Sequence, residues 1–391
     1  MRSFPGLPTA KPSPEVVIVG GGVIGCSIAY HLSLAGSSVR LIERDRLASG
    51  ASGVAAGMLA PQVEAHYDDP FFDLCLRGRD EHVQLAEDLK DRVGIDVERR
   101  TTGVFRLALD EAERVELLRQ MKWQAKRGLR AEWYEPRELG DLEPLLRGAA
   151  GRLLAGGLWF PDESQVHSPR LVAALAEVSV QSEAVLSEGT WATEILVDRH
   201  RATGVRTPAG IVEAGSVVLA AGVWSTDLAR AAGVDVPVTP VKGQLITLRA
   251  MGRAPKRIIW TGECYLVPKT GGQVILGATE EEGNYDRHPT LAGVGALATS
   301  AMEQLPWAGQ YSVEGVWAGL RPAAPDRFPI VGRVPGLENL LVATAHYRNG
   351  VLLGPLTGRR VAEAIQTGLI ASELAPFGLE RFQAPIPYVS G

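Results

Sequence analysis

The sequence V-V-I-V-G-G-G-V-I-G-C-S-I-A-Y-H-L at residues 16–32, with V-R-L-I-E at residues 39–43, decides the expected fold of this chain. The four apolar residues 16–19 are typical of a buried strand in a parallel sheet. Glycines follow in the spacing G-x-G-x-x-G, and a helical pattern of apolar residues comes after them. The second short strand ends on Glu43. Strand, glycine turn, helix and strand in this order predict a Rossmann-like dinucleotide-binding unit.

The glycines and the acidic residue each have a physical role in such a unit. Gly20 permits a tight turn, Gly22 lets the backbone approach a pyrophosphate, and Gly25 lets the helix pack close to the strand. The N-terminus of the helix offers free N–H groups to phosphates. Glu43 stands where a carboxylate accepts hydrogen bonds from ribose hydroxyls. An ordinary structural glycine turn is the alternative, but the agreement of all four elements favours dinucleotide binding.

The composition limits the classes of protein. A chain of 391 residues with 46% hydrophobic residues is long enough for two domains. The net charge of −5 is spread along the chain and indicates no surface for nucleic acid. No apolar run reaches the length of a membrane span, and the proline-rich residues 1–14 do not read as a signal peptide. Three widely spaced cysteines indicate neither a metal site nor disulfides, so we expect a cytoplasmic protein without metal.

Two later segments are rich in small residues, which suits contact with a flat ligand. Residues 50–61 read G-A-S-G-V-A-A-G-M-L-A-P, and Ser52 within them is a candidate phosphate ligand. A flexible loop is the alternative reading of this segment. The apolar run at residues 216–225 contains a predicted buried strand at residues 217–219, which ends in the small residues Ala-Ala-Gly. A nucleotide-binding sheet needs such an end where the ligand crosses it.

The remaining pattern predicts a mixed α/β chain. We expect helices at residues 70–89, 110–128, 137–146, 168–178, 291–304 and from near Pro355 to Thr367. We expect strands around Val97 and at residues 104–109, 184–186, 193–197, 202–207, 211–213, 217–219, 244–248, 265–268, 273–277, 312–320 and 340–344. A Rossmann-like domain would comprise residues 14–90, 150–223 and 326–386. A substrate domain on a mainly antiparallel sheet would comprise residues 91–149 and 224–325.

Seven motifs point to one family. They are residues 50–61 (G-A-S-G-V-A-A-G-M-L-A-P), 218–225 (V-L-A-A-G-V-W-S), 240–244 (P-V-K-G-Q), 264–268 (C-Y-L-V-P), 277–279 (G-A-T), 317–326 (W-A-G-L-R-P-A-A-P-D) and 346–353 (H-Y-R-N-G-V-L-L). In this order, over residues 16–365, the chain resembles flavoprotein amine oxidases of the D-amino-acid oxidase type. Within these it is similar to the glycine oxidases of thiazole (thiamin) biosynthesis.

The resemblance implies a reaction and a cofactor. FAD would be bound noncovalently, and no cysteine stands at residues 316–325, where related sarcosine oxidases attach flavin. Glycine, sarcosine or D-amino acids would lose a hydride from Cα to flavin N5. The imine would hydrolyse to a 2-oxo acid such as glyoxylate and ammonia or an amine, while oxygen becomes hydrogen peroxide. Glyoxyl imine would feed thiazole synthesis. The family also implies a homo-oligomer, with a tetramer as one form.

The same resemblance assigns site residues. The catalytic positions would be Tyr265, Arg321 and Arg348. The cofactor-binding positions would be Gly20, Gly22, Val23, Ile24, Gly25, Glu43, Arg44, Ser52, Ala55, Ala56, Gly57, Met58, Ala192, Ala221, Gly222, Trp224, Arg348, Asn349, Gly350, Val351 and Leu352. The chemistry is consistent, because an arginine fork is the best planar partner for a substrate carboxylate and a tyrosine hydroxyl adds a donor without charge.

Alternatives stay open at several of these positions. Arg321 could be a surface arginine paired with Asp326, and Tyr265 could be a core residue. His346 is expected to be structural, since hydride transfer needs no base. Glu280 departs from the apolar residue usual in glycine oxidases and could attract the substrate ammonium, repel its carboxylate or face solvent.

Two other functions fit part of the pattern. One is an FAD-dependent D-amino-acid or proline-type dehydrogenase that reduces a quinone. The other is a flavin-binding subunit without catalysis, which the presence of Arg321 and Tyr265 disfavours.

Overall fold

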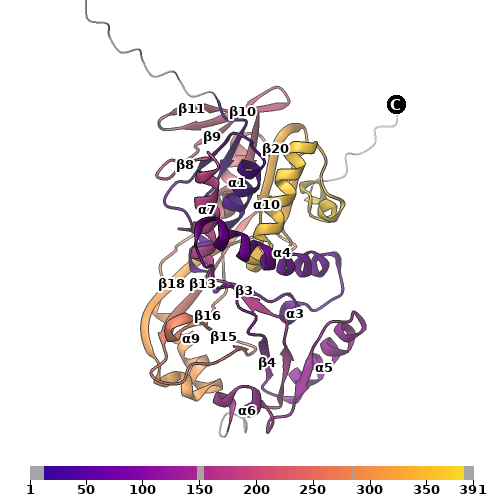
Figure 1. The fold of residues 1–391 in the computed structure, drawn as a ribbon, viewed down its shortest axis with the longest axis vertical. Helices are drawn as coiled ribbons and strands as arrows, with labels where there is room; N and C mark the ends of the chain where they lie inside the picture. Colours follow the sequence, from indigo (N-terminus) through magenta and orange to yellow (C-terminus); the bar gives the residue numbers. More distant parts are fainter. Residues whose placement is uncertain (1–12, 148–153, 284, 383–391) are drawn as a thin grey trace, which may run out of the picture.

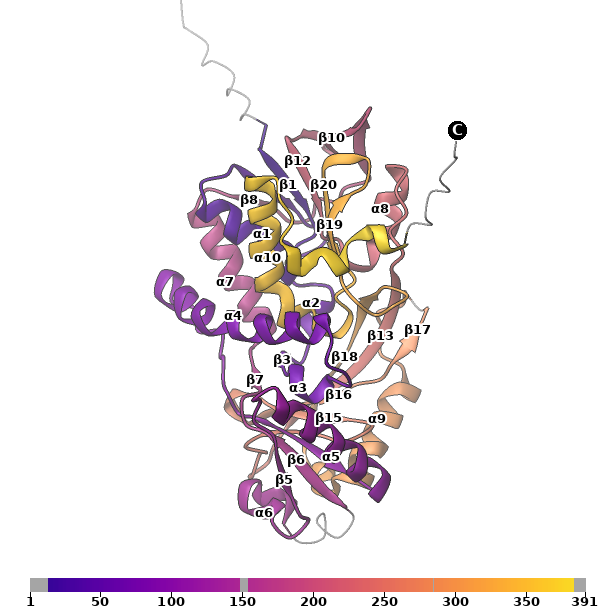
Figure 2. The same cartoon turned by 90° about the vertical axis from the view of Figure 1, so that its right-hand side faces the viewer.

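A computed structural model describes residues 13–147, 154–283 and 285–382 (Figure 1). Residues 1–12 of the proline-rich N-terminal stretch lie outside the described residues. A six-stranded sheet and a nine-stranded sheet occupy the two ends of an elongated molecule (Figures 1 and 2). Together with the helices, they confirm the predicted mixed α/β class. Within the described part of the chain, no helix is long and apolar enough to cross a membrane.

The six-stranded sheet has the order β19-β20-β12-β1-β2-β8. Its strands are β1 (Val16–Val19), β2 (Val39–Ile42), β8 (Val185–Ser187), β12 (Ser216–Leu219), β19 (Ile330–Val334) and β20 (Leu337–Thr344). β1 pairs in parallel with β2 and β12, β12 pairs in parallel with β20, and β19 is an antiparallel edge. The predicted Rossmann-like arrangement is therefore present.

This sheet is covered on both faces, which explains its apolar strands. Val16 and Ile18 pack in one core cluster with α1 (Val23–Leu34), α7 (Ser168–Gln181) and α10 (Gly350–Thr367). Val17 and Val19 pack in a second cluster with the antiparallel strands β9 (Glu194–Asp198), β10 (Arg201–Thr207) and β11 (Gly210–Glu213). In Figure 2, α1 and α10 lie in front of β1 and β20. Because alternate side chains of a strand point to opposite faces, all four residues of β1 must be apolar.

The nine-stranded sheet is mainly antiparallel, as predicted. Its strands are β4 (Val104–Ala108), β5 (Glu132–Tyr134), β6 (Gly156–Phe160), β13 (Thr239–Arg249), β14 (Ile258–Trp260), β15 (Tyr265–Pro268), β16 (Gln273–Gly277), β17 (Glu281–Glu282) and β18 (Ser312–Ala323). Around it lie α5 (Glu111–Lys126), α6 (Leu139–Leu142) and α9 (Leu291–Gln304). β6 belongs to this sheet, although its segment was assigned to the Rossmann-like domain. The domain boundaries remain a prediction.

Short elements join the two sheets. β18 pairs with β13 along its length, and Ala323 at its end forms a bridge with His346, which follows β20. Along the chain, β3 (Met58–Leu59) lies between α2 (Ala51–Val54) and α3 (Pro61–Glu64). It pairs with β7 (Ser164–Gln165). The long helix α4 (Pro70–Val93) packs against α10.

Some predicted elements are wrong. The segment around Val97, predicted as a strand, is an irregular connection. The carbonyl of Val97 accepts the N–H of His167 at 2.9 Å. The helix predicted at residues 137–146 is only α6 followed by a 3₁₀ turn at Pro144–Leu146, because Pro144 has no N–H to continue the helix.

The last predicted helix also begins earlier than expected. α10 begins at Gly350 and contains Pro355, which cannot donate to the carbonyl of Val351 four residues before it. His82 on α4 compensates, since its Nε2 lies 3.0 Å from that carbonyl oxygen and 3.2 Å from that of Leu352. Because both partners are acceptors, Nε2 carries the proton.

Candidate active site

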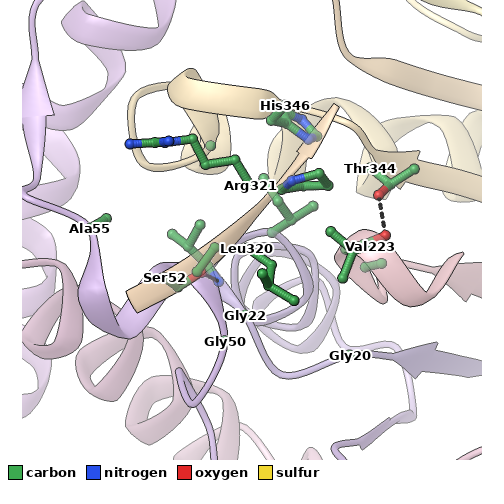
Figure 3. Close-up of a pocket in the computed structure, with 18 of the residues that line it drawn as sticks. Gly20, Gly22, Gly50, Ser52, Ala55, Val223, Leu320, Arg321, Thr344 and His346 are labelled. Atoms are coloured by element: carbon green, nitrogen blue, oxygen red, sulfur yellow. Dashed lines mark hydrogen bonds between the residues drawn. The ribbon is translucent and has the colours of Figure 1, made fainter. Parts of the chain in front are cut away.

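A cavity of about 380 Å³ lies between the two sheets, at the carboxyl ends of β1 and β12 (Figure 3). Most of the predicted cofactor-binding residues line it. They are Gly20, Gly22, Val23, Ile24, Glu43, Arg44, Ser52, Ala55, Ala56, Gly57, Met58, Ala192, Ala221, Gly222, Trp224, Arg348, Asn349, Gly350 and Val351. Gly25 and Leu352 do not line the cavity, because both are packed behind its wall.

The N-terminus of α1 forms one wall of the cavity. Ser52 Oγ accepts the N–H of Val23 at 2.9 Å, and a Cβ added at Gly22 would lie 3.2 Å from the same oxygen. A Cβ at Gly25 would lie 1.9 Å from the carbonyl oxygen of Gly20, so only glycine permits this contact between helix and turn. The backbone is therefore open to a ligand at Gly22 while Gly25 holds the helix against the sheet, which fits a pyrophosphate.

Glu43 is held beside this wall by the backbone. Its two carboxylate oxygens accept the N–H groups of Gly21 at 2.7 Å and Asp45 at 2.8 Å. The side chain that would bind ribose hydroxyls is thus fixed at the end of β2. Farther along, the guanidinium of Arg44 lies 4.3 Å from the ring centroid of Trp224, and the two side chains give this end of the cavity flat surfaces.

The small-residue segment at residues 50–61 is hydrogen-bonded to neighbouring elements, which disfavours the alternative of a flexible loop. Gly57 accepts the N–H of Val166 at 2.8 Å, and a Cβ at Gly57 would lie 2.1 Å from the Val166 carbonyl oxygen. The half-buried Lys269 donates from Nζ to the carbonyls of Ala56 at 2.6 Å and Val166 at 3.0 Å, and to Gln165 Oε1 at 3.0 Å. Lys269 therefore fixes the wall of the cavity from behind.

Two predicted catalytic side chains, Tyr265 and Arg321, meet in the wall of the cavity. Tyr265 on β15 is buried, and Arg321 on β18 is half-buried and donates from Nη1 to the carbonyl of Thr279 at 3.1 Å. Burial raises the pKa of Tyr265, and the charges of Arg321 and Arg348 oppose that rise. The tyrosine is therefore a neutral hydroxyl donor beside a cation. Tyr265 therefore packs in a core cluster and also lines the cavity, so the core and site interpretations do not exclude each other.

Arg321 does not pair with Asp326. Asp326 Oδ2 instead accepts from Arg381 Nε at 2.7 Å, so that alternative is wrong. Among the described residues, no carboxylate oxygen lies within 4.0 Å of the Arg321 guanidinium. Arg348 differs, because its Nε lies 3.5 Å from Glu64 and its Nη1 lies 3.6 Å from Glu280.

Glu280 lies at the rim of the site. Its side chain is 46% exposed, accepts from the hydroxyl of Tyr347 and pairs with Arg348. It is not among the residues that line the cavity, whereas Tyr347 is. Its carboxylate is therefore partly solvated and already engaged with protein donors.

His346, Thr344 and the start of α10 complete the wall. Burial lowers the pKa of His346 to about 3, and its Nε2 lies 3.0 Å from Thr357 Oγ1, so the imidazole is neutral at physiological pH. Thr344 donates to the carbonyl of Gly222 at 3.0 Å, the dashed line in Figure 3. The helix N-terminus at Gly350 lies at the cavity, five residues earlier than the sequence indicated.

Sequence reasoning missed Glu64 and Lys269. Glu64 lines the cavity and pairs with Arg348, and Lys269 fixes the small-residue segment. Both are charged residues next to proline or apolar residues, and such a context does not distinguish a half-buried charge in a cavity wall from a surface charge.

Comparisons with known proteins agree with this geometry. The family model described as FAD dependent oxidoreductase matches residues 15–364. Glycine oxidase from Geobacillus kaustophilus is 37% identical over 374 residues, which cover 94% of this chain and 97% of that protein. The crystal structure of glycine oxidase from Geobacillus kaustophilus superposes with a TM-score of 0.90 at 36% identity, covering 95% of this chain and 99% of that one.

Two further relatives extend the range. The bifunctional protein ThiO/ThiG of Trichormus variabilis is 33% identical over 94% of this chain, which matches 55% of that protein. The L-proline dehydrogenase of P. horikoshii has a TM-score of 0.81 at 25% identity, over 91% of this chain and 94% of that one. The length of the family match and the identity to these relatives show that the chain belongs to the FAD-dependent oxidoreductases of the D-amino-acid oxidase (DAO) family and is an enzyme that uses FAD.

Proposed function

We propose that this enzyme is a glycine oxidase, which oxidises glycine, sarcosine and small D-amino acids with oxygen as the electron acceptor. The observation that carries the proposal is the pair formed by Arg321 and Tyr265. A guanidinium without a carboxylate partner among the described residues lies beside a neutral hydroxyl in the wall of the same cavity that the N-terminus of α1 lines. Similarity to glycine oxidases over nearly the whole chain supports it.

The residues of the cavity suit FAD. The N-terminus of α1 and Ser52 would hold the pyrophosphate, and Glu43 would hold the ribose. The start of α10 would present N–H groups and the positive end of its dipole to the flavin ring. Bound there, FAD supplies the acceptor for a hydride.

The protein's own task would be orientation. Arg321 would hold the substrate carboxylate through two N–H groups, and the hydroxyl of Tyr265 would add a third donor. With the carboxylate fixed, Cα–H is directed toward the acceptor, and this arrangement needs no protein base. Neutral His346 is consistent with this, because it is already bonded to Thr357. Water would then convert the imine to a 2-oxo acid, which for glycine is glyoxylate, and release ammonia.

Three wider features also belong to the proposal. The ThiO/ThiG relative supports a role in thiazole synthesis for thiamin, where glyoxyl imine would be used. The family resemblance supports a homo-oligomer, with a tetramer as one form. The composition supports a cytoplasmic enzyme without a nucleic-acid or membrane partner, and the family resemblance together with the lack of cysteine at residues 316–325 supports noncovalent FAD.

Anaerobic reduction tests the proposal. Glycine added to the FAD-loaded enzyme should bleach the visible flavin absorption, and admitted oxygen should restore it with one hydrogen peroxide for each glyoxylate. Reoxidation by a soluble quinone but not by oxygen would instead identify a dehydrogenase. A flavin that no amino acid reduces would identify a binding protein.

A further inference from the structure

We propose that Glu64 determines how many negative charges a substrate can carry, because its carboxylate neutralises Arg348 in the cavity wall. The site then accepts amino acids with one carboxylate and rejects those with a second anionic group. The inference rests on the proposed function, in that Arg321 holds the first carboxylate. It concerns a different question, which is why only Arg321, and not the neighbouring Arg348, would bind an anionic group of the substrate.

The two arginines have different surroundings. Arg321 donates to the neutral carbonyl of Thr279, whereas Arg348 lies between two carboxylates, with Nε 3.5 Å from Glu64 and Nη1 3.6 Å from Glu280. The charge of Glu64 is the largest cause that raises the pKa of Arg348. Arg321 can therefore take a new carboxylate directly, while a new carboxylate at Arg348 must displace one that is already there.

The two carboxylates at Arg348 are not equivalent. Glu64 lines the cavity and is 24% exposed, whereas Glu280 is 46% exposed, lies outside the lining and also accepts from Tyr347. The less hydrated carboxylate, on the inner edge of the guanidinium, is therefore the one that a ligand would meet.

A buried amide cluster holds Glu64 in this place. Gln62, two residues earlier on α3, donates through its backbone N–H to Glu163 at 3.3 Å and through Nε2 to Gln124 at 3.0 Å. The carbonyl of Gln62 accepts from Gln120 at 2.7 Å. All four side chains are buried, so α3 cannot easily carry Glu64 away from Arg348.

A second anionic group directed at Arg348 would lie next to the Glu64 carboxylate. Two like charges in a partly desolvated site repel, and such juxtapositions reject the wrong ligand. Glu64→Gln would keep the shape of the side chain and remove the charge, so that no carboxylate would compete for the Nε side of Arg348.

A matched pair of unreactive ligands tests this without turnover. Methoxyacetate and diglycolate replace the amine of sarcosine and of N-carboxymethylglycine with an ether oxygen, and differ by one carboxylate. Each is titrated into the oxidised FAD-loaded enzyme, and the shift in visible flavin absorption gives Kd. The native enzyme should prefer methoxyacetate. Glu64→Gln should strengthen diglycolate relative to methoxyacetate by about 10- to 100-fold, as expected for removal of a close like charge.

Three variants serve as controls. Glu280→Gln removes the exposed partner of Arg348 and should change the ratio of the two Kd values less than about threefold, because exposed pairs are well screened. Glu64→Asp keeps the charge and should keep the native preference. Glu64→Gln combined with Arg348→Met should lose the gain for diglycolate while methoxyacetate still binds.

An unchanged ratio in Glu64→Gln, with methoxyacetate still bound, would overturn the assignment, as would an equal gain in Glu280→Gln. Failure of methoxyacetate to bind the native enzyme would reject both the inference and the carboxylate site at Arg321. Failure to oxidise glycine, with the predicted changes in binding present, would reject the proposed function alone.

Discussion

Arg321 crosses the face of β13 directly over Gly243, where a Cβ would lie 2.4 Å from Arg321 Nη2. Tyr265 has the same relationship to Gly277 on β16, where a Cβ would lie 2.4 Å from the phenolic oxygen. Neither glycine has a positive φ, so the backbone does not require glycine at these places. Glycine is required at both places because a Cβ would occupy the space of the Arg321 and Tyr265 side chains.

Gly243→Ala should therefore impair the enzyme through Arg321. The methyl group would push the guanidinium from its position and reduce kcat/KM for glycine by about 10- to 100-fold, which corresponds to about 1.4–2.8 kcal/mol. Gly295→Ala on α9 is the matched control, since a Cβ there meets nothing within 4 Å and alanine suits a helix. Steady-state kinetics and Tm of both variants decide the matter. Native kinetics in Gly243→Ala would show that Arg321 tolerates displacement or does not bind substrate.

Removing the guanidinium itself should have a larger effect. Arg321→Ala should cost about 2–5 kcal/mol of transition-state binding, as for a desolvated charge pair. That corresponds to roughly 30- to several-thousand-fold in kcat/KM. Arg321→Lys should also be poor, because a point charge does not replace the fork. Tyr265→Phe should lose about 0.5–1.5 kcal/mol, one hydrogen bond. Comparable losses in Tyr265→Phe and Arg321→Ala would contradict this ranking.

The nucleotide-binding part of the fold was predictable because its signals are local. The run at residues 16–19, the glycine spacing and Glu43 lie within one short stretch, and the structure has the expected parallel pairing there. The start of α10 was not predictable, since proline normally marks the first turn of a helix. Here the N–H that Pro355 lacks is replaced by His82, a residue far away in the sequence. Local patterns contain no record of such compensation.

The site was predictable to a similar extent. Nearly all the residues that the motif resemblance named line the cavity, but resemblance says nothing of charge balance. Arg348 is paired with Glu64 on α3 and with Glu280 after β16. Arg321, by contrast, has no carboxylate within 4.0 Å among the described residues. These ion pairs join distant segments, so only the fold distinguishes a paired arginine from one that can bind substrate.

Cofactor retention should depend on Gly22. Gly22→Val would place a branched side chain against Ser52, where the structure leaves 3.2 Å for a Cβ and where the pyrophosphate would lie. Acid precipitation should release all FAD from the native enzyme, since Cys26, Cys75 and Cys264 are buried and none lines the cavity. Gly22→Val should be purified with little or no flavin, and Gly22→Ala with an intermediate amount. Flavin remaining with the precipitated native chain would indicate a covalent bond.

The pH dependence of stability should report the buried His82. Burial lowers its pKa to about 4 from 6.5, so between these values the unfolded chain binds a proton that the folded chain does not. Stability must then fall with decreasing pH, by about 1.4 kcal/mol for each pH unit from this residue alone. Relative to His82→Gln, which does not titrate, the native protein should lose about 2 kcal/mol between pH 7 and pH 5 in urea unfolding. A difference independent of pH would show that the folded protein protonates His82 normally.

The substrate range should follow from the fixed carboxylate. With the carboxylate held by Arg321 and Tyr265 and one Cα–H directed toward the acceptor, the enantiomers of alanine place their methyl groups on opposite sides. Glycine needs no room on either side, and sarcosine extends only from nitrogen. We expect activity on glycine and sarcosine, lower activity on D-alanine and none on L-alanine, measured as anaerobic flavin reduction. Glu280→Val should alter the D-alanine rate less than about threefold, because this half-exposed carboxylate lies at the rim and exposed ion pairs contribute little. Preference for L-alanine over D-alanine would contradict the proposed orientation of the substrate, whatever the effect at position 280.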